Sequence, residues 1–235
     1  MQLVQETKNL VRLTRFGMVN CFLVREDDGL TLIDTSVAAS APSIRKAAQS
    51  LDAPIRRILL THAHIDHVGS LDALVSEYQG MEFAVGQRES RLLRKDFSLA
   101  AGETGKRLMG FPGAKSQPTR LLNDGDRIGS LQAVFSPGHT PGHFAFLDMR
   151  DGSLIAGDAF TTQTGVLAAG TFKLLFPFPA LFSWNREVAA ESARKLRGLK
   201  PERLAVGHGK TVESPLAAMD QAIELAFRQC GKMLD

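Results

Sequence analysis

The six histidines of this chain fall into three short segments of the sequence. These segments read THAHIDH at 61–67, SPGHTPGH at 136–143 and GHG at 207–209. Imidazole is the commonest ligand of transition metals in proteins, and a metal site needs several donors held about 2 Å from the ion. The clustering of the histidines therefore indicates a metal site whose ligands come from three separate parts of the chain.

The first segment has a spacing that allows one loop to serve two metal ions. His62 and His64 lie two residues apart after an apolar strand, so their side chains project to the same side. Asp66 and His67 open a helix and point back toward the same place. Asp158 ends the strand-like run SLIA and offers a carboxylate suited to bridging two cations. The predicted ligands are His62, His64 and His139 on one metal, Asp66, His67 and His208 on the other, and Asp158 between them.

Rigid elements must hold such ligands, and the apolar pattern of the chain predicts them. Short apolar runs alternate with stretches of helical period, which is typical of a layered α/β domain. An Asp-Asp-Gly turn at 27–29 predicts a hairpin, and Ser40 with Pro42 predicts a capped helix start. Strands are predicted at 18–24, 30–34, 55–61, 81–85 and 203–206, a meander at 121–160, and helices at 40–51, 66–78, 184–196 and from Ser214.

Length and composition favour one globular domain over 1–235, with an insertion at 87–118 near the active site. The chain has 235 residues, of which 44% are hydrophobic and 23% charged. The formal charge is only +3 without a long run of one sign, so nucleic acid is not an expected partner. No apolar run approaches the ~18 residues of a membrane span, so no membrane association is expected. Cys21 and Cys230 stand far apart, which excludes a disulfide framework and predicts a cytoplasmic protein.

Four motifs, taken in order, resemble those of the metallo-β-lactamase superfamily. They are the HxHxDH loop at 62–67, PGHTPGH at 137–143, the Gly-Asp pair at 157–158 and the Gly-His pair at 207–208. The resemblance covers the chain from about residue 18 to residue 210. It implies an α/β fold, the four-layer αββα sandwich, with the metals at one edge of the two sheets.

The resemblance also implies a dinuclear metal-dependent hydrolase acting on a small-molecule substrate. A metal-bound hydroxide would cleave an ester, thioester or lactone with an apolar acyl part, because two cations lower the pKa of a shared water toward ~7. Asp66 would orient this hydroxide and pass a proton to the leaving group. Nitrogen and oxygen donors without sulfur suit zinc, with manganese, iron and cobalt as alternatives.

Sequence differences from related enzymes narrow the range of expected substrates. Only 27 residues follow His208, too few for the helical domain of hydroxyacylglutathione hydrolases, which disfavours glutathione thioesters. Lactonase relatives have a tyrosine just after the bridging aspartate, and this tyrosine holds the lactone carbonyl. No tyrosine follows Asp158 in this chain, so a lactonase is possible but unsupported. An iron-dependent oxidoreductase of the persulfide dioxygenase type and a β-lactam hydrolase remain alternatives. A binding protein with an inert site is disfavoured because every ligand is intact.

Several further residues have two interpretations each. Asp34 either hydrogen-bonds the second nitrogen of a metal histidine or is a turn residue, and His143 either supports the ligands or packs in the core. The aromatic segment 172–184 either walls a hydrophobic substrate pocket or forms a core lid or homodimer contact. Its prolines argue against a regular helix. The predicted pocket residues are Phe16, Met18, Phe172, Phe176, Phe178 and Trp184.

Overall fold

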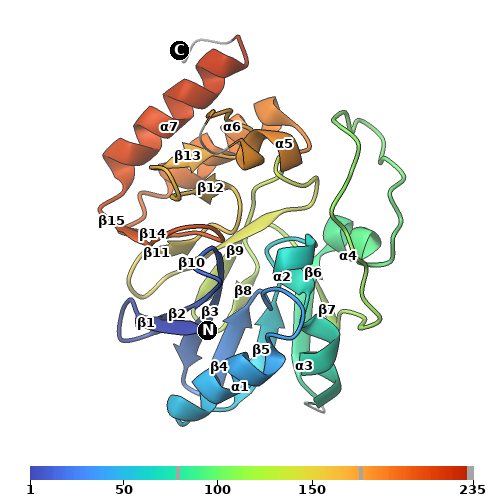
Figure 1. The fold of residues 1–235 in the computed structure, drawn as a ribbon, viewed down its shortest axis with the longest axis vertical. Helices are drawn as coiled ribbons and strands as arrows, with labels where there is room; N and C mark the ends of the chain where they lie inside the picture. The colour runs from blue at the N-terminus through green and yellow to red at the C-terminus, as the bar shows by residue number, and fades with distance from the viewer. Residues whose placement is uncertain (78–79, 175–176, 232–235) are drawn as a thin grey trace. The chain divides into compact units, whose positions relative to one another are not determined.

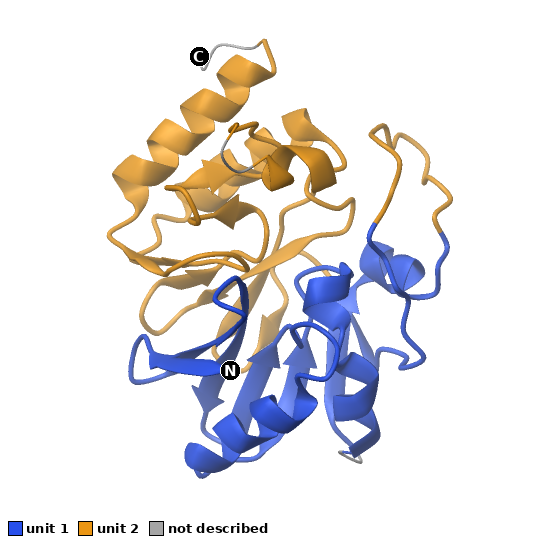
Figure 2. Cartoon of the chain, in the orientation of Figure 1, with its two compact units in different colours: residues 1–96, 110–122 blue, residues 97–109, 123–235 orange. Residues whose placement is uncertain are grey.

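The computed structural model describes residues 1–77, 80–174 and 177–231. They form two compact units, unit 1 with residues 1–96 and 110–122 and unit 2 with residues 97–109 and 123–235 (Figure 2). The predicted insertion at 87–118 is therefore divided between the units. The expected single domain over 1–235 stays a prediction.

The seven strands of unit 1 form one sheet in sequence order (Figure 1). The first four strands pair antiparallel with one another in order, and each later strand pairs in parallel with the strand before it. The predicted hairpin is confirmed, because Glu26 pairs with Gly29 across the turn. The strands are β1 (Gln2–Gln5), β2 (Leu10–Arg15), β3 (Val19–Glu26), β4 (Gly29–Ile33), β5 (Ile55–Leu59), β6 (Glu82–Gly86) and β7 (Arg120–Leu122).

The helices of unit 1 differ from the prediction in two places. The helix predicted over 66–78 is interrupted, because a break at Gly69 separates α2 from α3, and its last residue, Tyr78, lies outside the described residues. A side chain at Gly69 would bring its Cβ 2.3 Å from the backbone nitrogen of Ala38, so the chain crosses there too closely for any other residue. Ser40 precedes α1 without a side-chain capping bond, and its Oγ instead lies 3.4 Å from Ser36 Oγ. The helices are α1 (Ala41–Ser50), α2 (Ile65–Val68), α3 (Leu71–Glu77) and α4 (Gln87–Leu93).

Unit 2 contains a six-stranded sheet and a small two-stranded one. The predicted meander over 121–160 is confirmed for residues 127–155, where successive strands are antiparallel. It is wrong at both ends, because β7 pairs in parallel with β6 of unit 1 and Phe160 belongs to a separate small sheet. Across the larger sheet the strands are β15 (Val212–Glu213), β14 (Arg203–Ala205), β11 (Ser153–Ile155), β10 (Phe144–Asp148), β9 (Leu131–Phe135) and β8 (Arg127–Ile128). The smaller sheet pairs β12 (Phe160–Thr161) with β13 (Leu167–Ala168).

Three helices complete unit 2, namely α5 (Phe178–Phe182), α6 (Arg186–Gly198) and α7 (Leu216–Gln229). The α5 helix corrects the expectation that prolines exclude a helix from the aromatic segment. Pro177 and Pro179 sit at its cap and first turn, where a backbone N–H has no partner within the helix. Asn185 caps α6 by accepting from the amides of Glu187 and Val188. The buried faces of α6 and α7 share an apolar core with β11 and β14. Among the described residues, no helix combines the length and apolarity needed to cross a membrane.

Asp72, in the first turn of α3, fastens a loop of unit 1. Its carboxylate accepts the amides of Lys115 and Ser116 and the hydroxyl of Ser116 at 2.7–3.1 Å. Burial of this carboxyl raises its pKa, but the three donors outweigh burial, so the pKa is lowered overall.

Replacing Asp72 with asparagine should therefore lower the free energy of unfolding near neutral pH by about 1–3 kcal/mol. The contribution of a carboxyl with a lowered pKa is complete above its unfolded pKa and is lost as pH falls through the folded pKa. Denaturant titrations at pH 7 and pH 3 should show the two proteins converging in acid. Asp52→Asn, at an exposed position of unit 1, should change little at either pH, and an equal loss there would contradict the assigned role of Asp72.

Candidate metal ligands

The predicted ligands of unit 1 lie together at the carboxyl end of β5. His62 and His67 are wholly buried and His64 is 6% exposed. The ring of His62 lies 4.1 Å from that of His67 and 4.8 Å from that of His64, measured between centroids. Asp66 lies on α2, with its Oδ2 3.9 Å from His67 Nε2 and its side chain 28% exposed. Unit 1 thus brings four predicted donors to one place.

Asp34, which directly follows β4, holds two parts of this loop. Its Oδ1 accepts the amide of Thr61, and its Oδ2 lies 2.8 Å from both Thr61 Oγ1 and His67 Nδ1. The residue has φ 60°, a left-handed conformation that aspartate and asparagine tolerate better than most residues. Of the two interpretations of Asp34, this geometry supports the hydrogen bond to a metal histidine.

The same contacts set the protonation of two imidazoles. Asp34 is an acceptor, so His67 carries its proton on Nδ1. Thr61 Oγ1 donates to Asp34 and therefore accepts from His62 Nδ1, 3.0 Å away. In both rings the Nε2 lone pair is then the one available for a metal, as at metal sites generally.

Glu89 is a buried residue of this region that sequence analysis missed. It lies on α4, is wholly buried, and its Oε2 accepts the amide of Ala63 at 2.8 Å. Ala63 stands between His62 and His64, so the carboxylate fixes the backbone that carries both. No local sequence signal reveals this contact, because Glu89 lies 26 positions from Ala63 along the chain.

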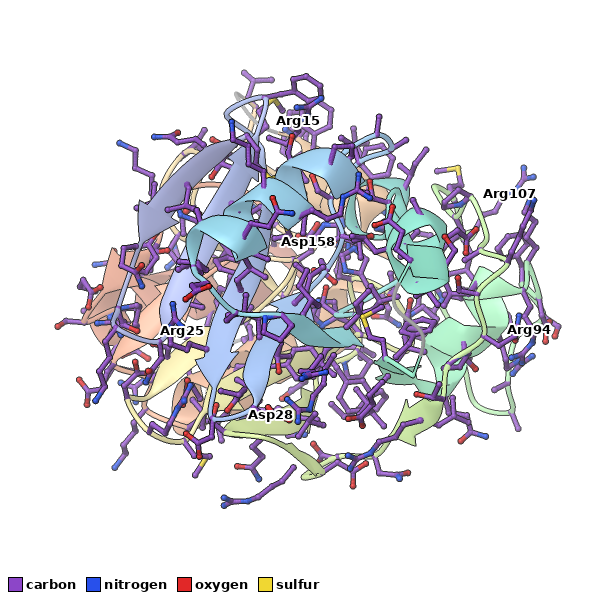
Figure 3. All side chains as sticks on the ribbon, turned by 90° about the horizontal axis from the view of Figure 1, so that it is seen from below. Arg15, Arg25, Asp28, Arg94, Arg107 and Asp158 are labelled. Atoms are coloured by element: carbon purple, nitrogen blue, oxygen red, sulfur yellow. The ribbon has the colours of Figure 1, made fainter. Side chains whose placement is uncertain are left out.

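In unit 2, Asp158 lies between two predicted histidine ligands. It follows β11 and is labelled in Figure 3. Its Oδ2 is 3.4 Å from His139 Nε2 and 3.2 Å from His208 Nε2. One carboxylate oxygen thus faces the ring nitrogens of two histidines from separate segments.

His139 is positioned by the turn that precedes α6. Its Nδ1 lies 3.4 Å from Ser183 Oγ, which donates to Pro179 O and so is free to accept. The preceding Gly138 has φ 129°, and a Cβ there would lie 2.2 Å from the amide nitrogen of Ala189. A glycine is therefore required for the histidine loop to approach α6.

His143 has a different environment from His139. Its Nδ1 faces Ser136 Oγ at 2.9 Å, and its Nε2 accepts the amide of Asp158 at 3.2 Å. Both ring nitrogens are therefore engaged within unit 2. The geometry supports the interpretation that His143 supports the ligands by holding the backbone of Asp158.

The predicted pocket residues are distributed over both units. Phe16 and Met18 are exposed near the turn between β2 and β3 of unit 1. In unit 2, Phe172 and Phe178 are exposed, whereas Trp184 is only 6% exposed. Phe176 lies outside the described residues. The structure therefore places Trp184 inside unit 2 and leaves the other described aromatic side chains accessible.

The donor set suits a divalent cation. The predicted ligands are imidazoles and carboxylates. Three of the imidazoles, those of His62, His67 and His139, have Nδ1 beside an oxygen that directs Nε2 toward a metal. Such donors are typical of zinc, manganese, iron and cobalt sites.

Comparison with known proteins identifies the family. Residues 14–208 match the family model of the metallo-β-lactamase superfamily, and the chain belongs to that superfamily. The expected fold class, the αββα sandwich of this family, is confirmed by similarity to solved structures with that fold and by the two sheets.

Several relatives are similar over much of the chain. It is 46% identical to "Uncharacterized protein YobT" of Bacillus subtilis, covering 88% of this chain and 90% of that one. It is 30% identical to "Probable metallo-hydrolase YflN" of the same species, over 80% and 78% of the two chains. It is also 30% identical to a hydroxyacylglutathione hydrolase of Legionella pneumophila, over 61% of this chain and 48% of that one. These names and the superfamily indicate a metal-dependent hydrolase.

A solved structure is also similar to this chain in both sequence and fold. "Crystal structure of TTHA1623 in a di-iron-bound form" superposes with a TM-score of 0.65 at 27% identity, covering 87% of this chain and 94% of that chain.

Replacing Asp34 with asparagine should weaken metal binding by about 10- to 100-fold, the usual effect of losing a partner of a ligating histidine. Asparagine tolerates the backbone of this position, so the change mainly removes charge and one acceptor. Chelator competition would measure zinc affinity, with circular dichroism to check folding. Asp28→Asn, which removes an exposed ion pair with Arg57 of the same sheet, should leave zinc affinity unchanged; if Asp34→Asn does so too, Asp34 does not support the metal.

Proposed function

We propose that the protein is a dinuclear metal-dependent hydrolase of an ester, thioester or lactone with an apolar acyl part. In this proposal His62, His64 and His139 would hold one metal, Asp66, His67 and His208 would hold the other, and Asp158 would be shared by both. The observation that carries the proposal is the position of Asp158 in unit 2. Its Oδ2 faces Nε2 of both His139 and His208, as a bridging carboxylate requires.

The chemistry follows from the donor set. If bound, two divalent cations would lower the pKa of a water and polarise a carbonyl oxygen. Asp66 is partly exposed, so its carboxylate is accessible to a substrate, orients the attacking water and returns a proton to the leaving group. Asp34 and Glu89 hold the loop that carries these residues, and His143 holds Asp158. Nucleophilic attack then needs no serine or cysteine of the chain.

The exposed aromatic side chains support an apolar acyl group. Phe172 and Phe178 of unit 2 and Phe16 of unit 1 are between 46% and 74% exposed. Large apolar side chains at the surface of a hydrolase favour contact with an apolar ligand. Because these side chains are also available to a second copy of the chain, a homodimer contact remains the alternative role. The similarity to a hydroxyacylglutathione hydrolase supports keeping thioesters among the substrates.

Zinc is the proposed metal, and we propose a cytoplasmic location because the only two cysteines, Cys21 and Cys230, stand far apart in the sequence and predict no disulfide framework. An iron-dependent oxidoreductase is the second candidate function, favoured by similarity to a protein solved in a di-iron-bound form. Elemental analysis of protein purified without added metal separates the two. Zinc with hydrolysis of esters, thioesters or lactones supports the proposal, whereas iron with no hydrolysis of that panel or of a β-lactam supports the oxidoreductase.

Replacing Asp158 with alanine should reduce bound metal and abolish hydrolysis, because the proposed bridge is lost. Replacing His139 with alanine should be comparably severe. Replacing His143 with alanine should cost less, roughly 10- to 100-fold, because it acts through the backbone of Asp158. Metal content and kcat/KM on one ester would be measured for all three. A larger loss for His143 than for His139 would mean that the ligand is wrongly assigned.

Replacing Phe178 with alanine should lower kcat/KM for long-chain esters more than for short ones. Loss of one aromatic contact with the acyl chain corresponds to roughly a tenfold fall in kcat/KM for a decanoyl ester, and little change for an acetyl ester. The matched control is Met149→Ala, which removes a similarly exposed apolar side chain from a turn of unit 2. Equal effects of Phe178→Ala on both esters would indicate a structural role.

A further inference from the structure

Residues 97–109, here called the strap, are fastened to unit 2 beside the start of α6. The amide of Lys106 donates to Trp184 O at 2.8 Å, and Asn185 Nδ2 donates to Thr104 O at 2.7 Å. The ammonium group of Lys106 donates to Ala180 O at 2.8 Å. The strap therefore lies directly over Trp184.

The indole of Trp184 carries a buried donor under this strap. Trp184 is 6% exposed, and its Nε1 has no hydrogen-bond partner among the described residues. A Cβ added to Gly105 would lie 2.3 Å from this nitrogen, so the strap backbone passes against the indole N–H. A buried N–H without an acceptor is unfavourable and is rare in folded proteins. A ligand oxygen would satisfy it.

Two cationic side chains belong to residues next to this indole in the structure or the sequence: the Lys106 amide donates to Trp184 O, and Arg186 is two residues after Trp184. Arg186 also has a buried Nε without a partner in the described chain, and its stem packs on Gly170. Burial lowers the pKa of Lys106, and the positive charge of Arg186 lowers it further. Within residues 1–77, 80–174 and 177–231, neither cation has a carboxylate partner. The first turn of α6 adds a partial positive charge.

We propose that Lys106, Trp184 and Arg186 form a binding site for the oxyanion group of a small molecule, a carboxylate or a phosphate. All three side chains are donors, two carry positive charge, and an anionic acceptor would satisfy both the indole N–H and the arginine Nε. Gly105 and Lys106 are exposed, so the strap side of the proposed site faces solvent. This inference concerns binding and does not depend on the proposed hydrolase activity.

The site is linked to a predicted metal ligand within unit 2. The amide of Trp184 donates to His139 O at 2.9 Å, and the neighbouring Ser183 contacts the imidazole of His139. An anion bound at Trp184 would therefore rest on the same turn that positions this histidine. A substrate with an anionic group could be held there by its charge.

Trp184 is the only tryptophan of the chain, so its fluorescence reports this site alone. The full-length protein as purified would be titrated with sodium phosphate and, separately, with sodium butyrate, at ionic strength kept constant with sodium chloride. We expect a saturable change with at least one of the two anions. Lys106→Met and Arg186→Met should each weaken the affinity by about tenfold or more, because each removes a charged donor.

Arg107→Met is the matched control, because it removes the same charge from the next strap residue, labelled in Figure 3, and should leave the affinity within twofold. Circular dichroism would confirm folding, and Lys106→Met, at an exposed position, carries the test if Arg186→Met does not fold. Response to phosphate alone assigns the site to phosphate groups, and response to butyrate alone assigns it to carboxylates. No saturable change, or equal weakening by Arg107→Met, would overturn the proposal. Ester hydrolysis assays are independent of either outcome.

Discussion

The candidate metal ligands depend on one constraint, the orientation and protonation of buried imidazole rings. A histidine can offer Nε2 to a cation only if its proton is on Nδ1, and a buried Nδ1–H needs an acceptor. Asp34 meets this need for His67 directly and for His62 through Thr61. One carboxylate, at the end of β4, thereby fixes two rings from the loop after β5.

Burying these acceptors is unfavourable by itself, and the fold of unit 1 must offset that cost. Asp34 does so by accepting from a backbone amide, a hydroxyl and an imidazole, and the parallel pairing of β4 with β5 brings all three donors to it. Glu89, on α4, accepts the amide of Ala63 within the same loop. Two buried carboxylates from different elements thus restrain a loop that carries three histidines.

Sequence alone predicted the local features of this arrangement and missed those that depend on tertiary contact. The histidine segments, the hairpin at 27–29 and most strands and helices have local signals, so they were predicted. The break at Gly69 depends on the approach of Ala38, and the pairing of β7 with β6 depends on sheet topology. The contacts of Glu89 with Ala63 and of Ser183 with His139 join residues 26 and 44 positions apart, and no pattern along the chain signals either.

The two histidines of the PGHTPGH segment show how neighbouring, identical side chains acquire different tasks. Both have Nδ1 beside a serine hydroxyl, so both direct the Nε2 lone pair away from that serine. In His139 this lone pair faces the carboxylate of Asp158, whereas in His143 it accepts the backbone amide of the same aspartate. A lone pair that accepts an amide is unavailable to a cation. His139 therefore offers a donor that faces the Asp158 carboxylate, whereas His143 holds the Asp158 backbone. For this reason the two histidines of the segment are not interchangeable.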